Sequence, residues 1–175
     1  MKLTRIFSLT LLLAASLFSF PVFAVNFNVV MNGGQEVPPN ASGASGNCTA
    51  VLSQNQASLS INCTHDATNV VAGHIHLGAA GMNGPFVFPF PTPTSPISET
   101  WSPVTNAQCG GSCVEELLAG NLYVNIHSTT YPGGEIRGQL VPQPVTPIPA
   151  LTTYGLVLLT LVLAAMGALL SRRLS

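Results

Sequence analysis

Two long apolar segments, one at each end of the chain, limit the part that can fold as a water-exposed domain. The first follows Lys2 and Arg5, runs from 6 to 18, and closes on the small-residue pattern that ends at Ala24. A basic start, an apolar stretch and small residues before the cut are typical of a secretory signal peptide. We therefore predict a signal peptide over 1–24, with cleavage after Ala24.

The second apolar segment predicts a membrane-spanning helix near the end of the chain. Residues 142–150 contain four prolines, which keep a spacer extended. Residues 151–170 carry no charge, and about 20 apolar residues suffice to cross a bilayer. Arg172 and Arg173 follow and are expected to stay in the cytoplasm. We predict a transmembrane helix with a basic tail over 151–175, which anchors the chain to a membrane at least transiently.

The charge of the middle part argues against nucleic acid as a partner. Between residues 25 and 146, six carboxylates oppose a single cation, Arg137, so the formal net charge is −5. Lys2, Arg5, Arg172 and Arg173 belong to the ends. Binding to nucleic acid requires basic patches, which this domain lacks.

All four cysteines lie in the middle part, and their even number in an exported chain predicts two disulfides. A hairpin centred on residues 55 and 56 would place Cys48 opposite Cys63. Cys109 and Cys113 would close a short glycine-rich loop. Zinc binding by these thiols is the weaker alternative, because thiolate sites usually show two close pairs in reducing compartments.

Apolar and polar residues alternate along short segments bounded by Gly, Pro and Asn, which predicts strands. We expect an all-β fold, an antiparallel sandwich or barrel that resembles an immunoglobulin or a superoxide dismutase. Residues 91–112 are expected to form a loop that holds Trp101, and 114–120 a single helical turn. The expected strands are 25–31, 48–54, 57–65, 70–77, 85–90 (an edge strand), 121–127 and 135–141.

Three of these strands place ionisable side chains on the face opposite their apolar residues. In 70–77, Val71, Ile75 and Leu77 are assigned to the apolar face, and two histidines to the other. If the three strands are neighbours, one polar cluster results. This cluster would contain His74, His76 and His127, with Asn125, Glu135 and Arg137 around them.

The histidine cluster permits two interpretations. Three imidazoles from two strands could hold one copper or zinc ion. Alternatively, the histidines could be structural and tie their strand to the glycine-rich loop 78–84, while Glu135 and Arg137 form a surface pair. No nucleophile with a matching base is evident, since Ser128 and His127 are neighbours on one strand and point to opposite faces. We therefore expect no enzymatic activity.

Three blocks of the chain resemble a known family. They are "GGQEVPP" (33–39), "GHIHLGAAGMNGPFV" (73–87) and "LLAGNLYVNIHSTTYPGGEIRGQL" (117–140). Together they are similar to the CHRD domain, a module named after chordin, over residues 25–141. The resemblance implies an extracellular β-rich binding or adhesion module and implies no reaction.

The C-terminal tail resembles a bacterial protein-sorting signal named for an Ile-Pro-Thr-Leu motif. The motif positions here are Ile148, Pro149, Ala150 and Leu151, with Ala150 in place of threonine. The resemblance implies processing by an exosortase-like enzyme and display in the cell envelope, on the outer surface or in an extracellular matrix.

The chain also shares features with copper–zinc superoxide dismutases, namely a His-x-His strand, a later histidine and a Gly-Gly…Arg-Gly segment. That likeness implies copper ligation by His74, His76 and His127, with Arg137 near an anionic substrate. The chain lacks a histidine between His76 and His127 to bridge two metals. The sequence thus predicts an exported module that binds a protein or polysaccharide, or alternatively a mononuclear copper or zinc protein.

Overall fold

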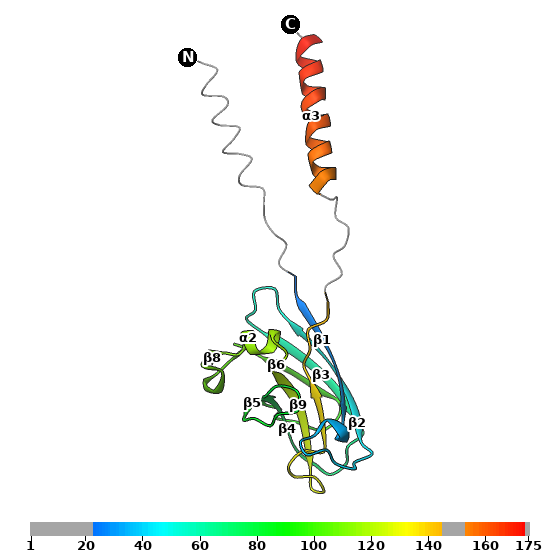
Figure 1. Ribbon diagram of the computed structural model, residues 1–175, viewed down its shortest axis with the longest axis vertical. Coiled ribbons are helices and arrows are strands. Elements are labelled where there is room, and N and C mark those ends of the chain that lie inside the picture. Colours follow the sequence, from blue (N-terminus) through cyan, green and yellow to red (C-terminus); the bar gives the residue numbers. More distant parts are fainter. Residues whose placement is uncertain (1–22, 145–152, 174–175) are drawn as a thin grey trace. The chain divides into compact units, whose positions relative to one another are not determined.

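The computed structural model describes residues 23–144 and 153–173 and divides into two units, residues 1–143 and 144–175. In the described part of the first unit, strands are the main regular secondary structure (Figure 1). Its strands are β1 (Val25–Asn32), β2 (Ser45–Leu52), β3 (Leu59–His65), β4 (Val70–Leu77), β5 (Phe86–Pro89), β6 (Ile97–Trp101), β7 (Thr105–Asn106), β8 (Gly111–Ser112), β9 (Leu122–Ser128) and β10 (Ile136–Gln139). Three short helical segments accompany them: η1 (Gly33–Gln35), η2 (Ala107–Cys109) and α2 (Val114–Leu118).

Eight of the strands form one antiparallel sheet in the order β5-β4-β9-β10-β1-β2-β3-β6. The sheet curls into a nearly closed barrel, which confirms the all-β prediction and favours a barrel over two separate sheets (Figure 1). The two edge strands approach through their side chains, because the rings of Phe88 and Trp101 stack with centroids 5.3 Å apart.

The inner face of the sheet holds the hydrophobic core. Alternate residues of each strand point inward, so that β2 alternates strictly between exposed and buried positions. Burial of these apolar side chains is the main force that holds the barrel together. Core residues with no exposed surface include Phe27, Met31, Leu52, Leu59, Ile61, Ile75, Leu122, Val124, Ile126 and Ile136.

Both predicted disulfides are present, Cys48–Cys63 and Cys109–Cys113. The first joins β2 to β3, where Cys48 and Cys63 are register partners in the hairpin centred between residues 55 and 56. The second closes the loop between β7 and α2. Alternation and spacing were therefore sufficient to find both bonds.

Two sequence predictions about this unit are wrong. Residues 91–112 are not a simple loop, because β6 pairs with β3 there and places Trp101 opposite Leu59. Val71 does not belong to the apolar face: it is 55% exposed, because a register shift between Val70 and Ala72 interrupts the alternation.

The second unit contains the helix α3 (Thr153–Arg173), which lies within the segment predicted to span a membrane. The structure does not support the predicted span: none of the helices in the described residues has the length and apolar character needed to cross a bilayer. The sorting residues Ile148, Pro149, Ala150 and Leu151 lie outside the described residues, as does most of the predicted signal peptide.

Candidate metal centre

The polar side chains predicted to cluster lie on the outer face of three neighbouring strands, β4, β9 and β10. Across these strands His74 is the register partner of Asn125, and Asn125 is the partner of Arg137. His76 is the register partner of Tyr123 in the next row. The adjacency of β4 to β9, which the sequence could only suggest, brings the histidines of both strands together.

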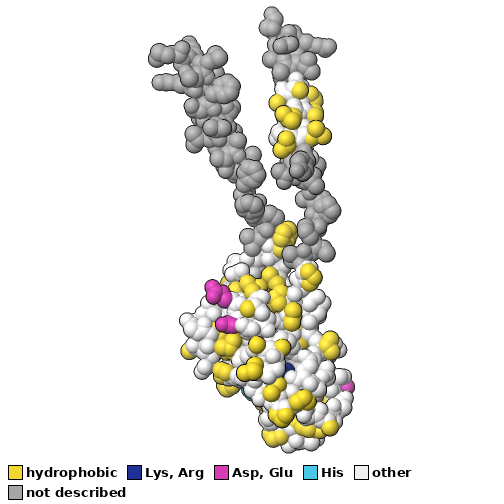
Figure 2. All heavy atoms as spheres, in the orientation of Figure 1, with side chains coloured by type: hydrophobic (Ala, Val, Ile, Leu, Met, Phe, Trp, Pro, Cys, Tyr) yellow, Lys and Arg dark blue, Asp and Glu magenta, His cyan; other side chains and the backbone are white. Residues whose placement is uncertain are grey.

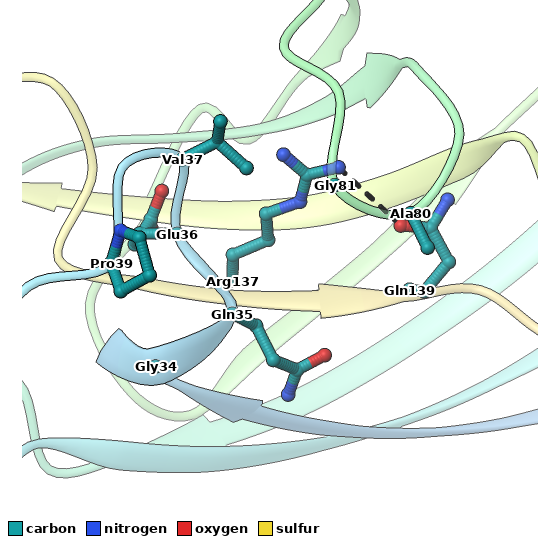
Figure 3. A pocket seen from close by; sticks show the side chains of 9 residues that line it. All are labelled: Gly34, Gln35, Glu36, Val37, Pro39, Ala80, Gly81, Arg137 and Gln139. Atoms are coloured by element: carbon teal, nitrogen blue, oxygen red, sulfur yellow. Dashed lines mark hydrogen bonds between the residues drawn. The ribbon is translucent and has the colours of Figure 1, made fainter.

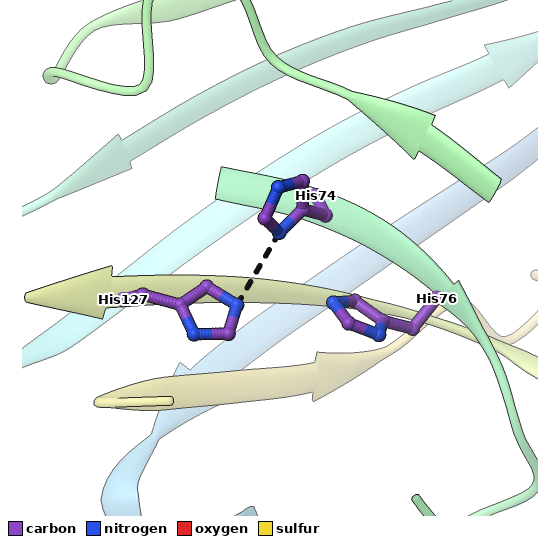
Figure 4. A group of neighbouring side chains, drawn as sticks. All are labelled: His74, His76 and His127. Carbon is purple, nitrogen blue, oxygen red and sulfur yellow. Dashed lines mark hydrogen bonds between the residues drawn. The ribbon is translucent and has the colours of Figure 1, made fainter. Parts of the chain in front are cut away.

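Three imidazoles converge at this place, those of His74, His76 and His127 (Figure 4). One ring nitrogen from each lies within 4.8 Å of the other two. The closest approach is between His74 Nδ1 and His127 Nε2, which are 3.3 Å apart. Nitrogens that share a metal at about 2.0–2.1 Å lie roughly 3.5 Å apart. The His74–His127 pair is already at this spacing, whereas separations of up to 4.8 Å within the group would have to shorten on coordination.

Backbone carbonyls determine which nitrogen carries the proton in two of the rings. His76 Nδ1 lies 2.9 Å from the oxygen of Gly84, and His127 Nδ1 lies 3.1 Å from the oxygen of Pro132. A carbonyl oxygen can only accept, so each Nδ1 must donate its N–H. The Nε2 atom of each ring then bears the lone pair, and that of His127 accepts a hydrogen bond from His74 Nδ1 at 3.3 Å. His76 Nε2 is buried and has no hydrogen-bond partner.

The surroundings keep all three imidazoles neutral. Burial, together with the neighbouring His127 and His76, lowers the pKa of His74 to about 4. Burial also lowers the pKa values of His76 and His127, although their bonds to backbone carbonyls act in the opposite direction. Neutral imidazole is the form that binds a metal ion, so the ligands need no deprotonation near pH 7.

Aromatic rings flank the histidines on two sides. Phe86 of β5 stacks on His74 with ring centroids 4.9 Å apart. Tyr123 of β9 stacks on His76 at 5.0 Å. These contacts restrict the rotation of both imidazoles and limit the access of water to them.

Arg137 lies beyond Tyr123 and is 1% exposed, so it does not form the predicted surface pair with Glu135. Its Cζ sits 3.4 Å from the centroid of the Tyr123 ring. Its Nη2 donates to the carbonyl oxygens of Ala79 and Met82, at 3.1 and 2.8 Å. Loop 78–84 closes over β10 because these bonds fix it there.

Glu135 and Asn125, predicted to surround the histidines, have other hydrogen-bond partners. Glu135 accepts a hydrogen bond from Ser42 Oγ at 2.8 Å, and Asn125 donates one to Glu36 at 3.4 Å. The carbonyls of Gly84 and Pro132, rather than these side chains, orient two of the imidazoles.

Glu36, which follows η1, was not among the site residues predicted from the sequence, where it lies only within the quoted block 33–39. It is 6% exposed, and burial raises its pKa to about 7 even though Arg137 and Asn125 act to lower it. Figure 3 shows Glu36 and Arg137 at one cavity of about 430 Å³. The cavity is lined by Gly34, Gln35, Glu36, Val37, Pro39, Ala80, Gly81, Arg137 and Gln139. In the sequence, only the position of this acidic residue just after a Gly-Gly turn could have indicated that Glu36 belongs to a site.

Charged side chains are otherwise sparse on the face of the barrel that Figure 2 shows. Arg137 is the only Lys or Arg between residues 25 and 143, and it is buried. Within the described residues, the three histidines are the one group of three or more potential metal ligands that converge.

Comparison with known families assigns both parts of the chain. Residues 146–173 match the IPTL-CTERM motif, which indicates an exported cell-surface protein that a sorting enzyme processes. Searches among curated proteins and among solved structures found no match. Residues 27–140, which include every strand of the eight-stranded sheet except the first two residues of β1, match the CHRD domain. The chain therefore belongs to the CHRD-domain family.

Proposed function

We propose that this chain is a cell-surface module that binds a single copper or zinc ion through His74, His76 and His127. The observation that carries the proposal is His76 Nε2, a buried nitrogen without a hydrogen-bond partner. A purely structural histidine would leave this lone pair unsatisfied, at a cost of about 1–3 kcal/mol. Coordination of a metal would satisfy it.

The hydrogen bonds of the cluster support the same function. Metal-binding histidines usually donate their second ring N–H to a carbonyl or carboxylate, which fixes the ring and selects the ligand nitrogen. His76 and His127 both do so, through the carbonyls of Gly84 and Pro132. The structural interpretation is therefore correct in part, since His76 does tie its strand to loop 78–84, and that bond leaves Nε2 available.

The donor set restricts the metal. Three imidazole nitrogens suit zinc and copper, and they leave a fourth position for water or another ligand. Hard cations such as calcium and magnesium prefer oxygen ligands, which this group does not offer. The proposal assigns a bound ion and no reaction.

Titration of the purified full-length protein, first stripped of metal, tests this function. We expect one Cu or Zn ion per chain. His127→Gln should weaken binding by about 100-fold or more, because losing a ligand should cost more than losing a hydrogen bond to a ligand. His65→Gln is the matched control, since His65 lies at the end of β3 and its Nε2 donates to Pro93 instead.

Equal metal affinity in the His127→Gln and His65→Gln variants would contradict the proposed site. So would a parent protein that binds neither ion. The ligand predicted from the sequence, a protein or polysaccharide, stays a prediction, as does signal-peptide cleavage after Ala24.

A further inference from the structure

We propose that the histidine cluster selects monovalent copper, Cu(I), over divalent ions, and that Arg137 determines this preference from behind Tyr123. The inference rests on the proposed metal-binding function and concerns the charge state of the ion. It follows from three features of the site: its donors, its fixed positive charge and its aromatic walls.

The donors supply no negative charge. The cluster consists of three histidines and includes no carboxylate or thiolate among the described residues. An ion bound here keeps its full charge in a half-buried place. The cost of moving an ion out of water rises steeply with its charge, so a divalent ion loses more hydration energy than Cu(I) does.

Arg137 adds a fixed positive charge to the same region. Its hydrogen bonds go to neutral oxygens, those of Ala79 and Met82. On the middle strand, Tyr123 contacts His76 from β4 and Arg137 from β10, which links the cation to the cluster. The guanidinium carbon lies 3.4 Å from the centroid of the Tyr123 ring, and the centroid of the His76 ring lies 5.0 Å from it. For charges roughly 10 Å apart at an effective dielectric constant of about 20, each added unit of charge on the metal costs about tenfold in affinity.

The carboxyl group of Glu36 neutralises the positive charge of Arg137 only in part. Its carboxyl group is buried near the guanidinium, and one of its oxygens, Oε1, has no hydrogen-bond partner. Since burial raises the pKa of Glu36 to about 7, much of the carboxyl is protonated at neutral pH. The region therefore keeps part of the positive charge of Arg137 at neutral pH, and less of it at higher pH.

The aromatic side chains next to the histidines also favour Cu(I) over divalent ions. Tyr123, which is buried, and Phe86, which is 53% exposed, stack on two of the three ligands and keep water from those ring faces. Divalent copper and zinc usually complete their coordination with a fourth ligand or more, whereas Cu(I) is stable with two or three. An apolar shell around a metal shifts its redox balance by limiting solvent.

Competition with chelators, performed without oxygen at pH 8, measures the affinities of the full-length protein for Cu(I), Cu(II) and Zn(II). We expect Cu(I) to bind most tightly. Arg137→Gln should move the ratio of the Cu(II) and Cu(I) dissociation constants about tenfold in favour of Cu(II). Circular dichroism checks that this variant folds, because Arg137 is buried.

A second variant, which is isosteric, tests the effect of local charge on this ratio in the opposite direction. At pH 8 Glu36 is mostly ionised, so Glu36→Gln removes negative charge beside Arg137 and should move the ratio several-fold in favour of Cu(I). Glu115→Gln on the exposed side of α2 is the control, and it should leave the ratio unchanged.

The two proposals fail in different ways. A protein that binds no ion overturns the metal-binding function and this inference together. A protein that binds metal through the histidines but prefers Cu(II) or Zn(II) overturns only the inference. An unchanged ratio in a folded Arg137→Gln variant and in Glu36→Gln also overturns it, because the charge of Arg137 would then have no influence.

Discussion

Strands β2 and β9 belong to the same sheet, three positions apart, and they bury their side chains in different ways. In β2, exposed and buried residues alternate without exception. In β9, all seven residues are buried. The inner faces are alike, so the difference arises on the outer face, where loops cover β9 and leave β2 open to water.

The covered outer face is where the polar chemistry collects. Tyr123, Asn125 and His127 point outward from β9, into space that loops 78–84 and 129–135 enclose. On the outer face of β2, water satisfies the polar groups. Beneath the loops each polar group needs a partner from the protein, and at the candidate site His76 Nε2 lacks one.

A substitution on the inner face of β9 and one on the outer face of β2 should give the largest contrast in stability. Ile126→Ala in β9 should lower the free energy of unfolding by about 4 kcal/mol, because it leaves a cavity in a fully buried place. Val51→Ala on the outer face of β2, where the side chain is 40% exposed, should cost under about 0.5 kcal/mol. Denaturant unfolding measures both values, and comparable losses would show that the barrel core is not where the structure places it.

The loop that covers β4 and β9 should be nearly as sensitive. An added Cβ at Gly84 would collide with the backbone oxygen of Leu77, so Gly84→Ala must displace the loop that orients His76. We expect a loss of about 2–3 kcal/mol, typical of overpacking, together with weaker metal binding. Gly43→Ala has open space around its Cβ and serves as the control. Normal stability and normal metal affinity in Gly84→Ala would show that the loop does not position the metal site.

The smallest effect should come from Glu36 and should depend on pH. The folded state raises the pKa of Glu36 from 4.5 to about 7, so it binds the proton more tightly than the unfolded chain does. The wild type therefore loses stability as the pH rises through this interval, whereas a glutamine does not titrate. From pH 5 to pH 8, Glu36→Gln should gain about 1–2 kcal/mol relative to wild type. A stability difference that stays constant with pH would contradict a buried, protonated carboxyl.

The alternation of apolar and polar residues made the strands and the directions of their side chains predictable. The hairpin of β2 and β3, its Cys48–Cys63 bond and the outward direction of His74, His76 and His127 all follow from a period of two residues. Alternation failed at Val71, where a bulge moves the side chain outward.

The covering loops could not be predicted, because their contacts join residues far apart in the chain. Asn40, for example, donates to the carbonyl oxygens of Gly134 and Glu135. Strand β6 was missed for a related reason: flanking prolines at 96 and 103 indicate a loop, and only the pairing with β3 makes the segment a strand. The burial of Glu36 and Arg137 depends on these same distant contacts.

The barrel closes at one line by stacking of Phe88 on Trp101 and not by pairing of backbones. Strands β5 and β6 therefore keep one row of amide and carbonyl groups each that no neighbouring strand of the sheet takes up. Exposed rows of this kind can pair with the edge strands of neighbouring molecules, and on a crowded cell surface such pairing would build fibres. Both strands are short, Pro89 ends β5, and Pro96 and Pro103 flank β6. Short edge strands and prolines oppose this pairing, so neighbouring copies on a surface stay separate molecules.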